Sequence, residues 1–341
     1  MAGHKILRLN ASLFPVGAFE AAQYRRYGIA PIEVEADTPA AILAHAADCD
    51  ALFAISVALP AELVNGLAKC RVISRLGAGT DKIAVDVATK RGIVVTNVPQ
   101  FCAEEQADHT MALLLSLVRR LPQMHAFMQE GAYSAAHALS RSNRRLASRA
   151  LGLVGFGYSA RLVAQRALGF GMRVIATRRR NLPAMAGVEM ADLATVLQQS
   201  DYVSLHLPLT AQSYHIIDAA ALRLMRPEAL LINTSRGALV DEAALEQALR
   251  EGWIAGAGLD TFEGVDVFVA DAKPPELALL RLPNVIATPH VAAGSVESGQ
   301  DVSAGGVENL VAILRGTWPR PGNVVNEGVV PRFPLTAFVP P

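Results

Sequence analysis

Apolar runs and helical stretches alternate along the first hundred residues of the chain. The apolar runs are rich in Ile, Leu, Val and Ala and have the length of buried strands, and the stretches between them have helical composition. Strands are expected at residues 6–9, 32–34, 51–55, 72–75 and 93–96, and helices at residues 16–27, 39–47, 61–67 and 85–91. This alternation predicts a small domain built on a parallel sheet.

The same alternation continues in the second half of the chain. Strands are expected at residues 151–154, 172–176, 202–207, 229–233 and 255–260, and helices at residues 191–199, 219–225, 241–251 and 295–315. Residues 101–130 predict one long helix that is too apolar for the surface, and residues 320–326 are expected to return to the first domain. The predicted fold class is therefore α/β, with two Rossmann-like or flavodoxin-like parallel-sheet domains.

One stretch, Leu151 to Ala176, has the pattern of a strand, a glycine turn, a helix and a second strand. Gly155 allows the tight turn, and Gly157 lets the backbone approach a pyrophosphate without a Cβ in the way. Ala160 is small enough for the helix to pack closely on the strand. The helix N-terminus offers unpaired N–H groups to phosphates. Since strand, turn and helix follow in the right order and spacing, the stretch predicts a dinucleotide site.

The residues after the second strand indicate which dinucleotide is bound. The dinucleotide fingerprint has an acidic residue here for the ribose 2′-hydroxyl, but this chain has Thr177 followed by Arg178, Arg179 and Arg180. Guanidinium groups suit a 2′-phosphate, which favours NADP, with NAD as the other possibility. The alternative interpretation is a solvated basic loop.

Composition excludes several other classes of protein. Hydrophobic residues make up 52% of the 341 residues, and 31 Lys and Arg balance 31 Asp and Glu, so no global field favours nucleic acid or an anionic membrane. No apolar run approaches the length of a membrane span, and no signal-peptide core precedes the first strand. Cys49, Cys70 and Cys102 lack metal spacing and cannot form a disulfide framework, so we expect no metal and a cytoplasmic location.

Residues with chemical function follow several of the predicted strands. A glycine-rich loop at residues 75–81 could present successive N–H groups to a carboxylate, although a plain turn before a helix explains it equally well. In the second half, strands end in HLPLT at 206–210, NTSRG at 233–237, GLD at 258–260 and TPH at 288–290. Because the carboxyl ends of parallel strands meet at one edge of a sheet, these endings are expected to converge.

With these endings the chain resembles the D-isomer-specific 2-hydroxyacid dehydrogenases. The resemblance covers nearly the whole length through RLGAGTDKIAVDVATKRGIVVTNVP, EEQADHTMALLLSLVRRL, GLVGFGYSA, VSLHLPLT, LINTSRGALVDEAAL, GAGLD and NVIATPHVAA, in the family's order. The EEQADHTMALLL helix and the DTFEGVDVF loop look closest to a branch shared by glycerate and glyoxylate reductases and the C-terminal-binding-protein corepressors. The resemblance implies an active-site cleft between a substrate-binding domain, 1–118 plus 292–341, and a dinucleotide-binding Rossmann domain, 119–291.

The resemblance also implies roles for individual residues. Arg236 matches the arginine that grips the substrate carboxylate and carbonyl oxygen, and His290 matches the acid–base histidine. Ala78 and Gly79 match the carboxylate-binding loop, and Val57 would line the side-chain pocket. The predicted cofactor-binding residues are Gly155, Gly157, Tyr158, Ser159, Ala160, Thr177, Arg178, Arg179, His206, Pro208, Thr210, Thr234, Asp260 (near the nicotinamide carboxamide) and Thr110.

The chain departs from the family pattern at the partner of the catalytic histidine. The family has a glutamate five residues after the aspartate of GLD, where it raises the histidine pKa, but this chain has Val265. Either Asp266 or Glu263 could replace it, and we favour Asp266 as the third catalytic residue. If neither does, activity should fall off at lower pH than in a typical member.

These observations lead to a function and to alternatives. The expected activity is NAD(P)H-dependent reduction of a small 2-ketoacid, such as glyoxylate or hydroxypyruvate, to the D-2-hydroxyacid, and the reverse oxidation. Family resemblance also implies a homodimer formed through the dinucleotide domain. The alternative is a dinucleotide-sensing interaction protein of the C-terminal-binding-protein type, which the absence of long Pro/Ser-rich flanks disfavours. Oxidation of another small anion, such as phosphite or formate, is a third interpretation.

Overall fold

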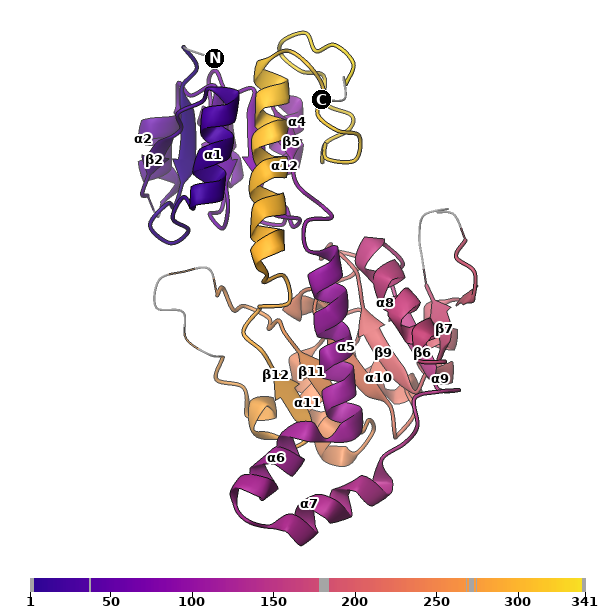
Figure 1. Cartoon of the computed structure of the whole chain (residues 1–341). Coiled ribbons are helices and arrows are strands. Elements are labelled where there is room, and N and C mark those ends of the chain that lie inside the picture. The colour runs from indigo at the N-terminus through magenta and orange to yellow at the C-terminus, as the bar shows by residue number, and fades with distance from the viewer. Residues whose placement is uncertain are drawn as a thin grey trace. The chain divides into compact units, whose positions relative to one another are not determined.

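A computed structural model describes residues 3–36, 38–177, 184–267, 269, 273 and 275–338. These residues form two compact units, each built on its own parallel sheet (Figure 1). One unit contains residues 3–36, 38–101, 269 and 294–338, and the other contains residues 102–177, 184–267, 273 and 275–293. The two parallel sheets confirm the predicted α/β class.

The sheet of the first unit has the order β2-β1-β3-β4-β5, the flavodoxin-like arrangement. Its strands are β1 (Ile6–Leu9), β2 (Ile32–Val34), β3 (Ala51–Ala54), β4 (Val72–Arg75) and β5 (Val94–Thr96). Its helices are α1 (Ala18–Tyr27), α2 (Pro39–Ala46), α3 (Ala61–Gly66), α4 (Val85–Lys90) and α12 (Val296–Leu314). All five strands were predicted to within a residue or two.

Helices cover both faces of this sheet because successive side chains of each strand point to opposite sides. On β3, Leu52 belongs to the apolar cluster that also includes residues of α2 and α3, whereas Phe53 belongs to the cluster with residues of α1 and α12. Figure 1 shows α1 and α12 side by side on that second face. Burial on both faces explains why the central strand β3 is a continuous apolar run rather than an alternating one.

A segment that follows helix α12 pairs with the edge strand β5. Val324 forms an antiparallel bridge with Thr96, and the Val325 N–H donates to the Val95 carbonyl at 2.8 Å. Asn326 accepts the Val95 N–H through Oδ1 at 2.8 Å and donates through Nδ2 to the Ile93 carbonyl at 2.9 Å. The predicted return of residues 320–326 to the first domain is confirmed.

The sheet of the second unit has the order β12-β11-β10-β9-β6-β7-β8, so the chain moves outward in both directions from β6. Its strands are β6 (Ala150–Val154), β7 (Arg173–Ala176), β8 (Val188–Met190), β9 (Tyr202–Leu205), β10 (Leu230–Asn233), β11 (Gly256–Leu259) and β12 (Val285–Ala287). This is the Rossmann-like order, with its topological switch point between β6 and β9.

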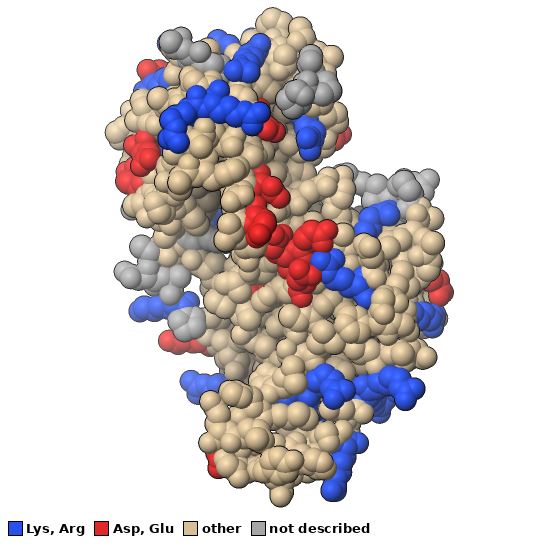
Figure 2. Space-filling view, viewed as in Figure 1, with Lys and Arg blue, Asp and Glu red and all other residues tan. Residues whose placement is uncertain are grey.

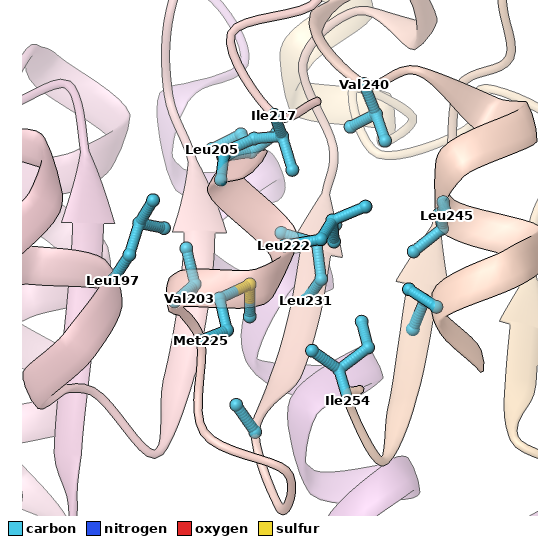
Figure 3. Packing of buried hydrophobic residues seen from close by; sticks show 14 of the residues in the cluster. Leu197, Val203, Leu205, Ile217, Leu222, Met225, Leu231, Val240, Leu245 and Ile254 are labelled. Carbon is cyan, nitrogen blue, oxygen red and sulfur yellow. The ribbon is translucent and has the colours of Figure 1, made fainter. Parts of the chain in front are cut away.

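Helices also cover both faces of this second sheet. They are α5 (Ala103–Arg119), α6 (Leu121–Gln129), α7 (Tyr133–Leu139), α8 (Tyr158–Gly169), α9 (Leu193–Gln199), α10 (Ala219–Leu224) and α11 (Glu242–Glu251), with 3-10 turns η1 (Ser140–Ser142), η2 (Gly237–Leu239) and η3 (Ala278–Arg281). One face packs on α9, α10 and α11 through the cluster in Figure 3, and the other on α5 and α8. Asp192, Asp218 and Asp241 cap α9, α10 and α11 by accepting backbone N–H groups.

Three local features differ from the sequence analysis. The single helix expected at residues 101–130 is wrong: Arg120 adopts a left-handed conformation, with φ of 55°, which ends α5 and starts α6. Pro122 then lies in the first turn of α6, where its missing N–H costs nothing. The strand β8 and the helix α7 were not predicted, since β8 is short and only partly buried and α7 follows no strong apolar period.

The contacts divide the chain between residues 101 and 102, whereas the sequence analysis placed the boundary between 118 and 119. The difference is helix α5. Its apolar residues, including Leu113 and Leu114, belong to the cluster that contains α8 and the β6 strand, so this helix is part of the second unit.

The molecular surface carries both signs of charge. On the face shown in Figure 2, most of the surface is neutral, and basic and acidic side chains are both present. Arg166 on α8, for example, lies 2.7 Å from both Glu104 and Asp108 on α5. Among the helices in the described ranges, none has the length and apolarity needed to cross a membrane.

Candidate active site

The glycine turn lies at the switch point of the second sheet. Gly155 follows β6 with a φ of 95°, and a Cβ placed there would be 2.4 Å from the carbonyl oxygen of His206, which follows β9. The Gly155 N–H donates to Thr177 Oγ1 at 3.0 Å, so the residue after β7 also holds the turn. Only glycine fits at position 155, because any side chain would be strained and would collide with backbone.

Gly157 serves a different purpose, since it caps the N-terminus of α8 and has free space around it. A Cβ at Gly157 would meet no atom within 4 Å. The first intrahelical bond runs from the Arg161 N–H to the Gly157 carbonyl at 3.1 Å, so the N–H groups of residues 158–160 precede the helical ladder. Ala160 is fully buried and Tyr158 is 57% exposed. This open, positively polarised helix end fits a pyrophosphate.

His206 contacts the first turn of α8 through Ser159. Its Nδ1 lies 3.2 Å from Ser159 Oγ and its Nε2 lies 2.9 Å from Ser204 Oγ. Burial lowers the His206 pKa to about 4, so the imidazole is neutral near pH 7. The other predicted residues of this strand end, Pro208 and Thr210, form a turn in which the Ser213 hydroxyl donates to the Pro208 carbonyl at 2.7 Å.

Arg236 follows β10 in a loop that is fixed by its own side chains. Asn233 Nδ2 donates to the Arg236 carbonyl at 2.8 Å, and the Arg236 guanidinium donates to the Ser235 carbonyl at 2.7 Å. Directly after it, a Cβ at Gly237 would lie 2.0 Å from the Phe262 carbonyl carbon and 2.2 Å from the Glu263 nitrogen. The loop that follows β11 therefore packs on the Arg236 loop, and Gly237 makes that close approach possible.

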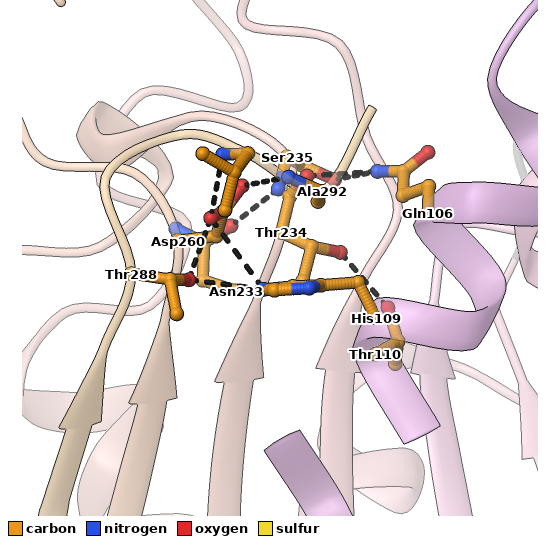
Figure 4. A network of polar contacts seen from close by, with 10 residues as sticks. Gln106, His109, Thr110, Asn233, Thr234, Ser235, Asp260, Thr288 and Ala292 are labelled. Carbon is orange, nitrogen blue, oxygen red and sulfur yellow. Dashed lines mark hydrogen bonds and ion pairs between the residues drawn. The ribbon is translucent and has the colours of Figure 1, made fainter. Parts of the chain in front are cut away.

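His290 lies in a turn after β12 that Asp260 organises. The His290 N–H donates to the Asp260 carbonyl at 2.7 Å, and the fully buried Asp260 carboxylate accepts the Val291 and Ala292 N–H groups, each at 2.9 Å. Asp260 also accepts the Thr288 hydroxyl at 2.6 Å (Figure 4). His290 itself adopts a left-handed φ of 57°, which is uncommon for a residue with a side chain.

Helix α5 contributes polar side chains to the same strand ends (Figure 4). Gln106 Nε2 donates to the Thr234 carbonyl at 2.8 Å, Thr110 Oγ1 lies 2.9 Å from Thr234 Oγ1, and His109 Nε2 lies 2.9 Å from Thr288 Oγ1. Thr110 is fully buried in these contacts. Thr110 and Thr234 were predicted from the sequence as cofactor-binding residues, whereas Gln106 and His109 were given no role there. The spacing of three residues between Gln106 and His109, which places both on one edge of the helix, was the signal that could have identified them.

Of the two acids near the missing family glutamate, Glu263 has partners of its own. His215 Nε2 lies 2.7 Å from Glu263 Oε2. The Tyr214 ring stacks on the His215 ring, with centroids 4.0 Å apart. The hydrogen bond of Tyr214 to the Glu263 carboxylate raises the Tyr214 pKa. These contacts hold the Glu263 carboxylate at His215, whereas Asp266 is half-buried three residues further along the loop.

In the first unit, the glycine-rich loop after β4 is held by side chains. Arg75 Nε donates to the Gly79 carbonyl at 3.0 Å, and Asn97 Nδ2 donates to the Ala78 carbonyl at 2.6 Å. With its carbonyls engaged in this way, the loop has a defined shape. Val57 packs partly buried against the apolar cluster of this unit. Arg178 and Arg179, predicted to bind a 2′-phosphate, lie outside the described residues.

Comparison with known proteins identifies the family. The NAD-binding-domain model of the D-isomer specific 2-hydroxyacid dehydrogenases matches residues 111–292. A glyoxylate reductase from Korarchaeum cryptofilum is 42% identical over 294 residues, which cover 85% of this chain and 86% of the relative. The chain belongs to the D-isomer specific 2-hydroxyacid dehydrogenases. The resemblance drawn from the motifs is thereby confirmed, and the second unit contains the family's NAD-binding domain.

Solved structures of this family's fold carry both forms of the cofactor. D-lactate dehydrogenase from Aquifex aeolicus, complexed with NAD and lactic acid, aligns with a TM-score of 0.81 at 26% identity, covering 94% of this chain and 99% of that one. An acyclic imino acid reductase complexed with NADPH and D-Arg aligns with a TM-score of 0.80 at 25% identity, with the same coverage. Members of one fold thus bind either dinucleotide, so the preference depends on local residues.

Proposed function

We propose that this dehydrogenase reduces a small 2-ketoacid of the glyoxylate or hydroxypyruvate type to the D-2-hydroxyacid with NAD(P)H, and catalyses the reverse oxidation. The observation that carries the proposal is the tie between the loops of Arg236 and His290. The Asp260 N–H donates to the Asn233 carbonyl at 2.9 Å and the His290 N–H donates to the Asp260 carbonyl, so one guanidinium and one imidazole follow strand ends that share hydrogen bonds. The similarity to glyoxylate reductases supports the choice of substrate.

Each of these groups supplies part of what a carbonyl reduction requires. Arg236 offers forked donors that can hold a carboxylate and polarise the adjacent carbonyl oxygen. His290 can donate a proton to the oxygen that gains negative charge, and accept one in the reverse direction. The N–H groups at the start of α8 would hold the pyrophosphate, and the reduced nicotinamide, when bound, supplies the hydride.

Asp266 is our candidate for the acid that supports His290. Glu263, the other candidate, is held by His215 and Tyr214. For the substrate, Ala78 and Gly79 are proposed to bind the carboxylate through their N–H groups, and Val57 to line the side-chain pocket. In the same way, the unit containing residues 3–101 and 294–338 is proposed as the substrate-binding domain, and the other unit as the dinucleotide-binding domain.

The proposed cofactor preference is NADP over NAD. It is supported by the sequence after Thr177, where arginines replace the acidic residue expected for a free ribose hydroxyl. Michaelis constants for NADPH and NADH test this preference. We expect a lower value for NADPH, and the double substitution of Arg178 and Arg179 by Ala should raise the NADPH value by at least about tenfold while changing the NADH value little. A clear NADH preference of the wild type would contradict the proposal.

The activity is tested with a panel of 2-ketoacids and both reduced dinucleotides, followed by nicotinamide absorbance. Glyoxylate and hydroxypyruvate should be turned over, and Arg236→Lys and His290→Gln should each lower kcat/KM by at least about a hundredfold. Dinucleotide binding without turnover of any member of the panel would instead favour the dinucleotide-sensing function.

A homodimer formed through the dinucleotide-binding domain and a cytoplasmic location complete the proposal. The dimer rests on the family resemblance alone, and the location on three free cysteines. Light scattering with size-exclusion chromatography tests the dimer, and cell fractionation tests the location.

A further inference from the structure

One edge of helix α5 contacts the loops of both candidate catalytic residues (Figure 4). Gln106 Nε2 donates to the Thr234 carbonyl, two residues before Arg236. One turn further along the helix, His109 Nε2 lies 2.9 Å from the hydroxyl of Thr288, two residues before His290. Because residues three apart on a helix share a face, a single rigid element contacts both loops.

The hydrogen bonds around Thr288 fix the direction of the proton on His109. The Asp260 carboxylate accepts the Val291 and Ala292 N–H groups, and it also accepts the Thr288 hydroxyl at 2.6 Å. A hydroxyl has one proton, so Thr288 Oγ1 must act as acceptor toward His109. His109 Nε2 therefore carries a proton, and it lies 3.5 Å from Asp260 Oδ1 as well.

The turn that receives these contacts has a conformation that needs support. His290 has a φ of 57°, and left-handed conformations of residues with a Cβ persist only where surrounding contacts hold them. The Asp260 carbonyl supplies one of those contacts and its carboxylate three, yet they do not fix the Thr288 side chain relative to α5. His109 does so, and its side chain is 23% exposed, so it is largely enclosed by its partners.

We propose that Gln106 and His109 are positioning residues for the reduction: they hold the Arg236 loop and the His290 turn at a fixed separation against α5. Neither residue needs to touch substrate for this purpose. The inference rests on the proposed function in naming the reaction, but the bracing of the two loops is a property of the fold that can be measured without turnover. Misplacement of a catalytic group by about 1 Å can cost about a hundredfold in rate, so loss of either brace should matter.

The first test separates kcat from KM in matched variants. His109→Leu removes the hydrogen bond between His109 and Thr288 at similar volume, and Thr288→Val removes that bond together with the one to Asp260. Each should lower kcat for glyoxylate about 10- to 100-fold while the KM values for ketoacid and dinucleotide stay within about threefold. His109→Gln and Thr288→Ser keep a donor and a hydroxyl and should recover most of kcat. His45→Leu, which removes an exposed histidine of α2, is the matched control and should have no effect.

The second test is independent of the reaction. Hydrogen–deuterium exchange of the peptide that covers residues 288–292 should accelerate at least about tenfold in His109→Leu, but not in His109→Gln or His45→Leu. Unchanged exchange in His109→Leu would overturn the inference, as would an unchanged kcat or an equal loss in His109→Leu and His109→Gln. If the wild type turns over no ketoacid, the proposed function fails while the exchange measurement still decides whether His109 braces the turn.

Discussion

His215 and Glu263 are 48 residues apart in sequence, and His215 Nε2 lies 2.7 Å from Glu263 Oε2. The Glu263 N–H donates in turn to Glu242 Oε1 at 2.7 Å. Burial, the largest influence, raises the pKa of Glu242. These contacts fix the start of the loop in which the family glutamate is missing and engage the Glu263 carboxylate with His215. Asp266 therefore becomes the acid to test as the partner of His290.

Asp266→Asn should move the pH dependence of ketoacid reduction. A carboxylate near an imidazole stabilises its protonated form, so its removal should lower the apparent pKa of the group that donates the proton, by about one unit. Activity in the reduction direction should then decline at lower pH than in the wild type. Glu263→Gln is the matched control and should leave the apparent pKa in place. Coincident profiles of Asp266→Asn and wild type would remove Asp266 from the mechanism.

Gly155→Ala should lower stability, whereas Gly157→Ala should lower dinucleotide affinity without lowering stability. At Gly155 the new Cβ would lie 2.4 Å from the His206 carbonyl oxygen at a φ of 95°, so we expect a loss of about 2 kcal/mol or more in the free energy of unfolding. At Gly157 the Cβ meets open space, so the melting temperature should change little. Dinucleotide affinity of Gly157→Ala should nevertheless fall at least about tenfold, because the Cβ projects where a pyrophosphate would approach. Unchanged affinity would place the cofactor elsewhere.

Gly237→Ala should destabilise the protein and abolish ketoacid reduction. The added Cβ would lie 2.0 Å from the Phe262 carbonyl carbon, and backbone cannot yield as a flexible side chain does. Overpacking of this kind costs about 1–3 kcal/mol or more. Gly299→Ala is the matched control, since Gly299 is exposed within α12 and its Cβ would meet no atom; helix propensity predicts a gain of up to about 1 kcal/mol. Chemical denaturation of both variants gives the comparison.

His206 should make stability depend on pH below neutrality. Burial lowers its pKa in the folded state from 6.5 to about 4. Between these values the unfolded chain binds a proton that the folded chain does not, so the free energy of unfolding rises with pH across this interval. The His206 contribution is complete above pH 6.5 and is lost as the pH falls toward 4, by up to about 3 kcal/mol. In His206→Gln the free energy of unfolding should fall less steeply as the pH is lowered over the same range. Parallel curves for the variant and the wild type would contradict the role of His206 in this pH dependence.

Features that depend on local chemistry could be predicted from the sequence. Gly155 and Gly157 predicted a turn and a helix start because their positions are set by the local backbone geometry of the strand, turn and helix. Apolar runs such as residues 51–54 predicted strands because burial on both faces leaves no polar positions. Arg120 did not predict a helix break, since an arginine in a left-handed conformation has no sequence signature comparable to that of glycine.

Features that depend on distant contacts could not be predicted in the same way. The Gln106 contact with Thr234 joins residues 128 apart, and the His109 contact with Thr288 joins residues 179 apart. Their geometry exists only once α5 is packed against the carboxyl ends of β10 and β12. Motif resemblance indicated which loops form the candidate site. The contacts of α5 with those loops could be recognised only in the folded structure.

The pairing of Val324, Val325 and Asn326 with β5 has a practical consequence for handling this enzyme. An uncovered edge strand is a template onto which a second chain can add, and here the protein's own later residues occupy that position. Deleting residues 320–338 would expose the backbone of β5 and favour self-association, even though no residue proposed to act in catalysis would be lost. Fusion partners should therefore be placed so that residues 324–326 remain paired with β5.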